Sequence, residues 1–514
     1  MRTIGTGCVV FLFSFHAAVA MGGQPVACED LQRLNLPGTV VMSTELVDAD
    51  ETTGWPAHCL AEGTVEGRIR FRAQLPVAAD WNGRFMMGGG GGFVGNMQNQ
   101  ALGVMPGAGG DALTRGYATI GTDTGHRGHP PETAFLDASW ALDNLPGIKD
   151  WGYRAVPKVA ETGQRLVEAH YGRPASHNYF LGCSNGGRQA LKLAQLDPHL
   201  FDGIVAIAPA IDWTGVMLGH LAIARAMFPD GKDQGAVLSA EDVQALNAAV
   251  NEHCDGLDGL ADGIVSDPGA CDFDPRTALP DFSEAQLRAV EAVYGGVEID
   301  GRRFHPGFPP GSEATAGAWD MWLTGSATPQ WLPGMPAVSV GSRFAMETFR
   351  YLAANDPGLE LTALEPGAEL VEELRFVSRI ASATNPDLGI FRDSGGKLLI
   401  THGMADHALP VGHSTDYHQR VAERMGEDVD DFMRLFLLPG VVHCLGGDGP
   451  DRIDLIAAIE AWVEENQAPQ SLAALKFDGD GEVTMARPVC AYPMRQQHDG
   501  EGDPASSESF VCEP

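Results

Sequence analysis

The segment Leu181-Gly182-Cys183-Ser184-Asn185-Gly186-Gly187-Arg188 contains the pattern G-x-S-x-G. Residues 178–181 (NYFL) before it have the character of a short buried strand, and residues 188–196 (RQALKLAQL) after it place apolar residues at helical spacing. A glycine-flanked serine between a strand and a helix is typical of a nucleophile elbow, a tight turn that exposes the serine hydroxyl at the edge of a sheet. The helix that follows directs N–H groups and the positive end of its dipole toward developing negative charge. This segment therefore predicts an α/β sheet that carries Ser184 as a nucleophile.

Apolar and alternating runs recur on both sides of this segment. Strands alternating with helices predict a doubly wound α/β core. Between residues 212 and 387 the alternation gives way to helical pieces and Gly/Pro-rich loops, so we expect an inserted lid domain there and a catalytic domain made of residues 21–211 and 388–514. The tail from Ala486 is expected to be rich in loops. The expected strands are residues 68–75, 84–87, 117–120, 203–208, 397–400 and 433–438, and the expected helices include 156–171 and 455–463.

Two of the later strands end in loops that supply partners for the serine. Residues 397–400 lead to Asp406, and residues 433–438 lead to His443. A serine nucleophile needs a base, and the base needs an orienting carboxylate. Loops beyond the carboxyl ends of parallel strands gather functional groups, and the order serine, acid, histidine is that of α/β-hydrolases. We therefore predict an α/β-hydrolase fold with Ser184, Asp406 and His443 as the catalytic residues.

Five consecutive glycines, Gly88 to Gly92, follow the expected strand 84–87. A flexible linker and a dinucleotide-binding loop are the alternatives. In a chain with a nucleophile elbow, the better interpretation is a loop whose N–H groups hold an oxyanion together with the N–H of Asn185. We expect Gly90 and Gly91 to be the donors of that loop.

A second loop, residues 121–126, contains Asp123 and His126, which invite a catalytic role. We interpret both as members of a hydrogen-bonded structural loop.

Residues 1–20 have the pattern of a secretory signal: Arg2, an apolar run over residues 8–15 and Ala18-Val19-Ala20. The apolar run is shorter than the roughly 20 residues that span a bilayer. We therefore expect a secreted or periplasmic protein without a membrane anchor. The formal net charge of −34 argues against nucleic acid as a partner because phosphates would be repelled. The sequence does not specify an oligomeric state.

Eight cysteines remain once Cys8 of the signal is removed, an even number that suits an oxidising compartment. Nearness along the chain favours three disulfides and leaves Cys183 with Cys444. That last bridge would join the nucleophile turn to the histidine loop. The three local pairs are Cys28–Cys59, Cys254–Cys271 and Cys490–Cys512.

Residues 254–264 (CDGLDGLADGI) carry three aspartates among glycines. Oxygen ligands at close spacing with glycines that bend the chain suit Ca²⁺, although the loop is not an EF-hand because the glutamate at position twelve is missing. A set of Asp-Gly turns is the alternative. Because Cys254 and Cys271 would close the loop, we expect structural calcium on Asp255, Asp258 and Asp262.

Together these motifs resemble the tannase and feruloyl esterase family, which also includes hydrolases of mono-(2-hydroxyethyl) terephthalate. The paired Cys-Ser and His-Cys steps are the most specific part. The resemblance implies a Ser184–His443–Asp406 triad, a Cys183–Cys444 bridge, and calcium ligation that includes the Leu260 and Ile264 carbonyls. Similar proteins often have threonine where this chain has Asn185. The motifs are WNGRF (81–85) with the glycine loop, DTGH (123–126), GCSNGGRQ (182–189), the aspartate loop, HGMAD (402–406), HCLGG (443–447) and RPVC (487–490).

The sequence thus predicts a secreted serine esterase acting on small esters of aromatic, phenolic acids. The lid is rich in aromatic residues that suit a ring, and His402 is expected to reach Asp406 and to contact the substrate. The alternatives are a terephthalate half-ester hydrolase, a peptidase, and an inactive calcium-stabilised binding protein on the same scaffold. The lid aromatics are Trp213, Trp319, Trp322, Trp331, Phe344, Phe349 and Tyr351.

Overall fold

The structure is a computed structural model that describes residues 23–103, 110–232, 235–327 and 337–514. The expected signal segment and Trp331 lie outside these residues. Among the helices of the described part, none has the length and apolar character needed to cross a membrane.

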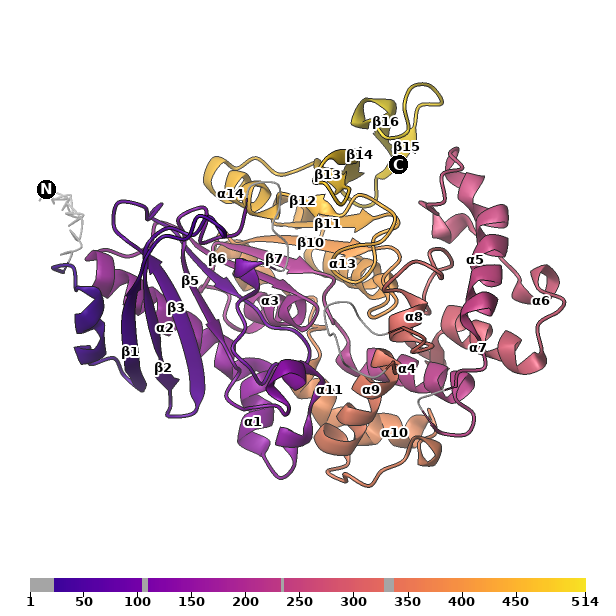
Figure 1. Cartoon of the computed structure of the whole chain (residues 1–514), viewed down its shortest axis with the longest axis horizontal. Helices are drawn as coiled ribbons and strands as arrows, with labels where there is room; N and C mark the ends of the chain where they lie inside the picture. Colours follow the sequence, from indigo (N-terminus) through magenta and orange to yellow (C-terminus); the bar gives the residue numbers. More distant parts are fainter. Residues whose placement is uncertain (1–22, 104–109, 233–234, 328–336) are drawn as a thin grey trace, which may run out of the picture.

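A nine-stranded sheet forms the centre of the molecule, in the order β1-β2-β3-β5-β4-β6-β7-β10-β11 (Figure 1). Strands β1, β2, β3 and β5 pair antiparallel, whereas β5, β4, β6, β7, β10 and β11 pair parallel. The parallel part is the expected doubly wound core. The strands are β1 (Thr39–Val47), β2 (His58–Val65), β3 (Ile69–Pro76), β4 (Phe85–Gly88), β5 (Ala118–Thr122), β6 (Asn178–Cys183), β7 (Gly203–Ile207), β10 (Lys397–Gly403) and β11 (Met433–Leu438).

Helices cover both faces of the parallel strands. Alternate residues of each strand enter different apolar clusters: Phe180 packs with α2, α3 and α13, whereas Tyr179 and Leu181 pack with α14. This alternation explains why the central strands are apolar on both sides. The core helices are α1 (Leu145–Lys149), α2 (Ala155–Tyr171), α3 (Asn185–Leu196), α12 (Gly389–Asp393), α13 (Val411–Met425) and α14 (Leu455–Glu465).

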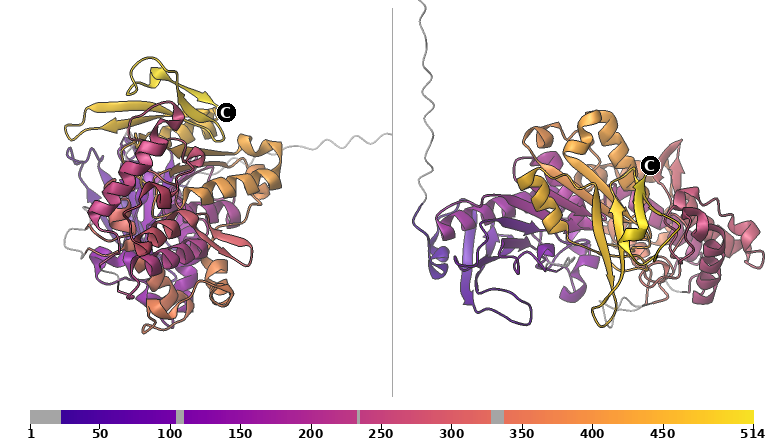
Figure 2. Two further views of the ribbon diagram at one scale, coloured as in Figure 1. Left: turned by 90° about the vertical axis from the view of Figure 1, so that its right-hand side faces the viewer. Right: turned by 90° about the horizontal axis from the view of Figure 1, so that it is seen from above.

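The segment between β7 and β10 is mainly helical and lies at the opposite end of the molecule from β1–β3 (Figures 1 and 2). Most of its buried residues form one apolar cluster, which also takes in Phe93 and Trp151 from the catalytic part. The segment therefore packs directly on the sheet's loops. Its elements are α4 (Trp213–Met227), α5 (Ala240–Cys254), α6 (Pro275–Ala278), α7 (Glu284–Gly295), β8 (Val297–Ile299), β9 (Arg302–His305), α8 (Trp319–Trp322), α9 (Val340–Glu347), α10 (Ala368–Glu373) and α11 (Arg375–Ala381).

Short 3-10 and π segments join these elements. They are η1 (Cys28–Arg33), η2 (Gln100–Leu102), η3 (Pro131–Leu136), η4 (Ser139–Ala141), η5 (Asp150–Arg154), η6 (Asp255–Asp258), η7 (Pro268–Ala270), η8 (Thr348–Ala353), η9 (Leu361–Ala363), η10 (Glu427–Asp431) and η11 (Ser507–Ser509).

The C-terminal tail is more regular than its sequence indicates. Before Ala486 the chain forms β12 (Arg452–Ile453) and β13 (Ser471–Phe477), which pair in one sheet with β14 (Val483–Cys490). From Ala486 onward it contains the end of β14 and a hairpin of β15 (Arg495–His498) and β16 (Phe510–Glu513). β15 is polar (RQQH), and only a few residues of β14 are buried, so the pattern of these strands is weak. Residues 491–494 and 499–509 form turns and a short 3-10 segment, as expected of a loop-rich tail, whereas the β15–β16 hairpin was not predicted.

Small residues are required where β6 turns into α3. A Cβ atom on Gly182 would lie 2.5 Å from the carbonyl carbon and oxygen of Gly186. We expect Gly182→Ala to lower the free energy of unfolding by about 1–3 kcal/mol, because the turn cannot relax without moving backbone. Gly479, where an added Cβ would have no neighbour within 4 Å, is the matched control. Urea unfolding of both alanine variants checks this; equal stabilities would contradict it.

Candidate active site

Ser184 stands at the turn between β6 and α3 in a strained backbone conformation, with φ 63° and ψ −122°. Non-glycine residues rarely adopt positive φ. Hydrogen bonds hold the turn: the Ser184 N–H donates to the Ile207 carbonyl (2.9 Å), and the Ser184 carbonyl accepts from the Ala210 N–H (3.2 Å). The elbow that the sequence predicts is present.

Asp406 and His443 meet as their positions after β10 and β11 predict. His443 Nδ1 lies 2.8 Å from Asp406 Oδ2. Asp406 Oδ1 accepts hydrogen bonds from the N–H groups of Ala408 and Leu409. Burial opposes ionisation of the Asp406 carboxyl, but the His443 and His402 rings outweigh burial and hold its pKa well below the ordinary value. The carboxylate is therefore a fixed negative charge next to His443.

His402 reaches Asp406, as expected, but it does not face a substrate. Its side chain is fully buried, with Nε2 3.3 Å from Asp406 Oδ2 and 3.1 Å from the Leu409 carbonyl. Its Nδ1 lies 2.7 Å from Ser414 Oγ. Both ring nitrogens thus have protein partners, because the side chain points into the base of the Asp406 loop. The expected substrate contact of His402 is wrong, and its position is that of a support for the carboxylate.

The glycine loop differs from expectation in which N–H groups are free. The Gly90 N–H donates to Gln189 Oε1 (3.1 Å) and the Gly91 N–H donates to Gln98 Oε1 (2.8 Å). Two side-chain amides thus already satisfy the donors predicted for an oxyanion. The assignment of Gly90 and Gly91 is therefore corrected.

Gly92 takes their place beside the serine. It lines the same pocket as Ser184, its carbonyl accepts from Trp151 Nε1, and its N–H donates to no residue that the structure describes. Asn185 opens α3, so its N–H has no acceptor within the helix. These two N–H groups are the available donors near Ser184. In the sequence, the run of five glycines indicates this loop, but it does not show which glycine N–H is free.

A buried arginine ties the glycine loop to the elbow. Asn185 Nδ2 donates to the Gly90 carbonyl, and Asn185 Oδ1 accepts from Arg188 Nε (2.7 Å). Arg188 is fully buried, donates to the carbonyls of Gly152, Trp151 and Ala381, and has no carboxylate partner among the described residues. Burial lowers the pKa of Arg188 to about 9. The side chain of Asn185 therefore holds the glycine loop against the start of α3.

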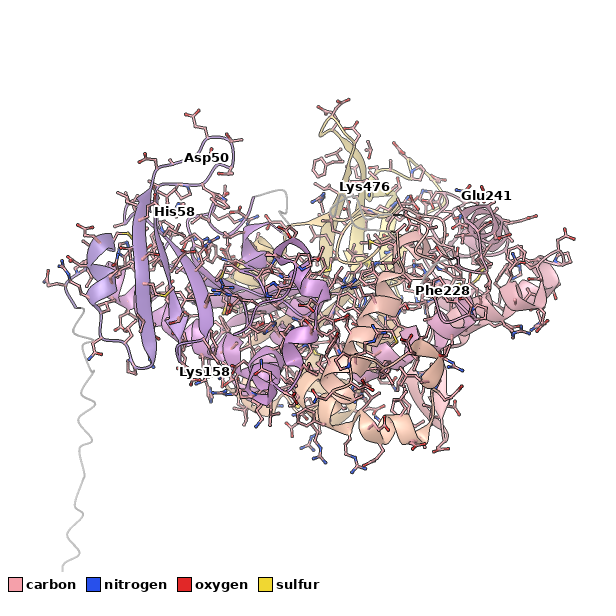
Figure 3. All side chains as sticks on the ribbon, turned by 60° about the horizontal axis from the view of Figure 1, so that its bottom comes forward. Asp50, His58, Lys158, Phe228, Glu241 and Lys476 are labelled. Carbon is pink, nitrogen blue, oxygen red and sulfur yellow. A yellow bond between two sulfur atoms is a disulfide. The ribbon has the colours of Figure 1, made fainter. Side chains whose placement is uncertain are left out.

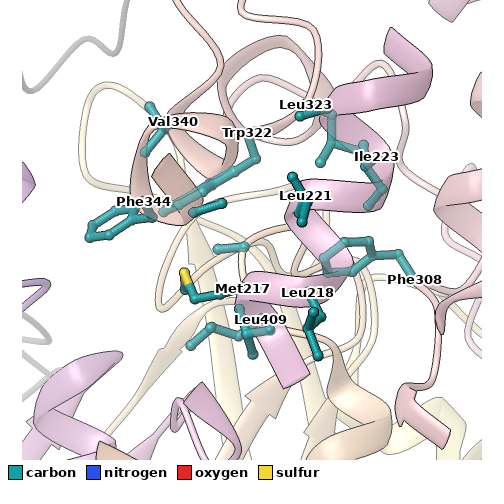
Figure 4. Close-up of a cluster of buried hydrophobic side chains, with 14 of the residues drawn as sticks. Met217, Leu218, Leu221, Ile223, Phe308, Trp322, Leu323, Val340, Phe344 and Leu409 are labelled. Atoms are coloured by element: carbon teal, nitrogen blue, oxygen red, sulfur yellow. The ribbon is translucent and has the colours of Figure 1, made fainter. Parts of the chain in front are cut away.

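One pocket brings Ser184 and His443 together with residues of the lid. Its lining is mainly apolar, with α4 on one side and α8 and α9 on another (Figure 4). Phe344 stacks on Trp322 at 6.2 Å between ring centroids, and Trp322 meets the His443 ring edge-on at 5.1 Å. The lining residues are Gly92, Ser184, Ala210, Trp213, Val216, Met217, His220, Trp322, Phe344, Ala408, Leu409 and His443.

Sequence reasoning missed some members of this pocket. His220 and Met217 stand on α4, inside a run that reads only as an apolar helix. Trp319, Phe349 and Tyr351, which the sequence offers equally, do not line it. Position along a helix does not by itself show which of these side chains face the pocket and which do not.

All four expected disulfides are formed. Cys183–Cys444 joins the residue before Ser184 to the residue after His443, with 6.2 Å between Cα atoms. The other bridges are Cys28–Cys59, Cys254–Cys271 and Cys490–Cys512.

Asp123 and His126 lie in a hydrogen-bonded loop, as expected. Asp123 forms an ion pair with Arg70 and accepts the Gly125 N–H, while His126 Nε2 lies 2.8 Å from the Phe93 carbonyl. Neither lines the pocket of Ser184.

The aspartate loop is built from turns that its own carboxylates cap. Asp255 accepts the N–H groups of Asp262 and Gly263, and Asp258 accepts that of Leu260. Burial, with the neighbouring Asp262 and Asp255 charges, raises the pKa of Asp258. Arg487 pairs with Asp262. The three carboxylates are not drawn together: within the described ranges, the one group of three potential ligands within 4.8 Å is Cys183, His443 and Cys444, and its cysteines form a disulfide.

Comparison with known proteins places this geometry in context. The family described as tannase and feruloyl esterase matches residues 56–513. An uncharacterized esterase of Xanthomonas campestris is 32% identical, over 98% of this chain and 93% of its own. The mono(2-hydroxyethyl) terephthalate hydrolase of Piscinibacter sakaiensis is 31% identical, over 89% and 85%. The crystal structure of feruloyl esterase B from Aspergillus oryzae is 26% identical, with a TM-score of 0.79 over 95% of this chain and 99% of that one.

Three buried histidines near the site predict a loss of stability in acid. Burial lowers the pKa of His126, His220 and His407 to about 4, from an ordinary value of 6.5. Between these values the unfolded chain binds more protons than the folded one, so stability is present above about pH 6.5 and falls as the pH drops toward 4. We expect a lower Tm at pH 5 than at pH 7.5.

Neither ring nitrogen of His407 has a hydrogen-bond partner among the described residues, so His407→Phe keeps the packing and removes one titrating group. Its Tm should fall less between pH 7.5 and pH 5 than that of the wild type. The exposed His253→Gln is the control and should behave as the wild type does. If the Tm of His407→Phe falls between pH 7.5 and pH 5 by as much as that of the wild type, the explanation is contradicted.

Proposed function

This chain belongs to the tannase and feruloyl esterase family and is a carboxylic ester hydrolase, and on that premise we propose that it is an exported serine esterase that cleaves esters of phenolic aromatic acids. The observation that carries the proposal is the pocket that Ser184 and His443 share with Trp213, Trp322 and Phe344. Four disulfides fit export to an oxidising compartment.

In the proposed reaction, Ser184 Oγ attacks the ester carbonyl and its proton passes to His443 Nε2. The hydrogen bond to Asp406 fixes the His443 tautomer with the proton on Nδ1, which leaves Nε2 as the base. The protonated ring then donates to the leaving alcohol. A water molecule, deprotonated by the same nitrogen, cleaves the acyl-enzyme and frees the acid.

The developing oxyanion needs donors that are already oriented. We assign this role to the N–H groups of Asn185 and Gly92, because both lie next to Ser184 and neither has a hydrogen-bond partner in the described structure. The dipole of α3 adds positive potential at the same place.

The pocket also favours one class of acid. Aromatic side chains provide flat apolar surfaces for a ring. Among the described residues, no lysine or arginine lines the pocket, so a free carboxylate on the ring, as in a terephthalate half-ester, would lose its hydration without a cationic partner. His220 is the polar lid residue of the lining: its Nε2 lies 2.8 Å from the Ala408 carbonyl, which only accepts, so the neutral ring carries its proton on Nε2. We therefore favour phenolic acids.

Two alternatives make different predictions. A terephthalate half-ester hydrolase would turn over mono-(2-hydroxyethyl) terephthalate best. The Piscinibacter sakaiensis relative bears that name, which is the specific observation in its favour. An inactive calcium-stabilised binding protein would release no product from any ester.

A panel of methyl ferulate, methyl gallate, mono-(2-hydroxyethyl) terephthalate and p-nitrophenyl butyrate tests the proposal. We expect the highest kcat/KM for one of the two phenolic esters, because only these fill the aromatic pocket without burying a charge. Ser184→Ala is the blank and should lower kcat by about 10⁶-fold. A highest kcat/KM for the terephthalate or the butyrate would reject the phenolic assignment, and rates equal to the blank would support the inactive alternative.

We also propose that Ca²⁺ stabilises the aspartate loop. Asp255, Asp258 and Asp262 would hold it with the carbonyls of Leu260 and Ile264, an all-oxygen donor set of the kind Ca²⁺ prefers. Burial is the main cause of the raised pKa of Asp258, and the charges of Asp262 and Asp255 add to the rise, which a bound cation would oppose. The loop belongs to the lid segment and lines no part of the Ser184 pocket, so the ion would be structural.

Chelation tests the calcium proposal. Because an ion bound to the folded state alone stabilises it, EGTA should lower the Tm and added Ca²⁺ should restore it. Asp255→Asn should have a low Tm that no longer responds to either. Asp281→Asn, an exposed lid aspartate outside the loop, is the control and should keep the full response. A wild-type Tm that does not change in excess EGTA would rule the ion out.

A further inference from the structure

A second concave surface lies on the antiparallel end of the sheet, apart from the Ser184 pocket. It encloses about 420 Å³ between the β1–β2 connection, strands β2 and β3, and the segment 97–102. Asp50 and His58, two of its lining residues, are labelled in Figure 3 at the β1–β2 end of the molecule. We call this surface the β2–β3 groove. Its volume is within the usual range for ligand pockets, about 300–1,000 Å³.

Three polar side chains line the groove with unused hydrogen-bonding atoms. Gln74 is 5% exposed; its Oε1 accepts from Thr119 Oγ1, and its Nε2 has no partner among the described residues. Asn99 Oδ1 accepts from the Ala101 N–H, while its Nδ2 is buried and likewise unpaired in the described structure. The groove thus offers two amide donors.

The third side chain supplies an acceptor. His58 is 3% exposed, and its Nδ1 lies 2.9 Å from the Pro56 carbonyl. A carbonyl only accepts, so Nδ1 carries the hydrogen and Nε2 of the neutral ring accepts. Of the three atoms, Asn99 Nδ2 is the one that is both buried and unpaired among the described residues, and buried polar atoms in native proteins are nearly always paired. The groove therefore offers a ligand two donors and one acceptor.

Trp55 adds an apolar wall. Its ring is partly exposed and held in place, because Nε1 donates to Asp111 Oδ2 (2.7 Å) and the ring meets the His58 ring edge-on. A fixed indole presents a flat surface at little entropic cost.

The charged residues of the groove restrict which ligands it can bind. Asp48 and Asp50 line the groove, while its one guanidinium among the described residues, that of Arg72, already pairs with Glu62. An anion would meet two carboxylates and no free cation on this part of the described surface. A neutral ligand with many hydroxyls matches the donors, the acceptor and the indole, since each hydroxyl can both donate and accept and a sugar ring has an apolar C–H face.

We propose that the β2–β3 groove is a binding site for neutral saccharides. The segment that forms one wall of the groove also reaches the reaction centre. Gln98 accepts the Gly91 N–H, and Gln100 accepts the Cys183 N–H and donates to the Cys183 carbonyl. Residues of this one segment therefore contact both the groove and the turn that carries Ser184. Saccharide binding itself does not depend on the acyl specificity proposed above.

Isothermal titration calorimetry of the whole mature protein with xylohexaose, mannohexaose and hexagalacturonate tests the site. We expect saturable binding of at least one neutral hexasaccharide and none of the uronate. Trp55→Ala, which removes the indole wall, should weaken binding by about tenfold. Its kcat/KM on p-nitrophenyl butyrate should remain at the wild-type value.

Asn99→Asp guards against a loss caused by misfolding. It keeps the oxygen that accepts the Ala101 N–H and replaces the unused donor by a charged oxygen, so it should bind about tenfold more weakly, and its Tm shows whether it is folded. Phe376→Ala, which removes an exposed aromatic ring on α11, is the control and should bind as the wild type does. The proposal is overturned if no neutral saccharide binds, if hexagalacturonate binds as tightly, or if folded Trp55→Ala and Asn99→Asp bind like the wild type.

Discussion

The backbone of Ser184 is the constraint on which the rest of the site depends. A positive φ at a residue with a side chain costs about 1–3 kcal/mol and persists only where its surroundings enforce it. Here the enforcement comes from several directions. The Gln100 side chain hydrogen-bonds both the N–H and the carbonyl of Cys183, and a carbonyl of β7 accepts the Ser184 N–H. The Cys183–Cys444 disulfide joins the turn to the loop of His443. The strain and the position of the histidine are therefore stabilised by the same set of contacts.

Two buried charges flank this turn and are satisfied in different ways. The Asp406 carboxylate has two histidines and two N–H donors. The Arg188 guanidinium has no carboxylate partner in the described part of the chain and relies on three backbone carbonyls, Asn185 and the face of Trp151. Burying such a cation costs several kcal/mol unless its hydrogen bonds are complete. Because its partners come from α3, η5 and the end of α11, the completed set also fixes how the lid segment meets the elbow.

The sequence predicts those parts of the molecule that depend on local pattern. β11 begins and ends where expected, and the loops after β10 and β11 deliver Asp406 and His443 to one place because parallel strands end at one edge. The sequence did not predict β1 and β2, whose exposed positions mix apolar and polar residues, or the strands of the tail, where few residues are buried. It also assigned Gly90, Gly91 and His402 wrongly. Those errors share a cause: whether an N–H or a ring nitrogen is free depends on distant side chains such as Gln189, Gln98 and Ser414.

In the proposed reaction, chemistry and specificity come from different parts of this chain. Gly92, Ser184, Asp406 and His443 all stand on loops of the sheet, whereas most of the aromatic surface of the pocket comes from α4, α8 and α9 of the inserted segment. The sheet loops are held by a disulfide, buried charges and backbone hydrogen bonds, which tolerate little change. The inserted helices meet the pocket through apolar side chains, which tolerate exchange at similar volume. Substitutions on α4, α8 and α9 can therefore alter the acid that is bound without disturbing Ser184. This explains how relatives that share one fold can be named after different ester substrates.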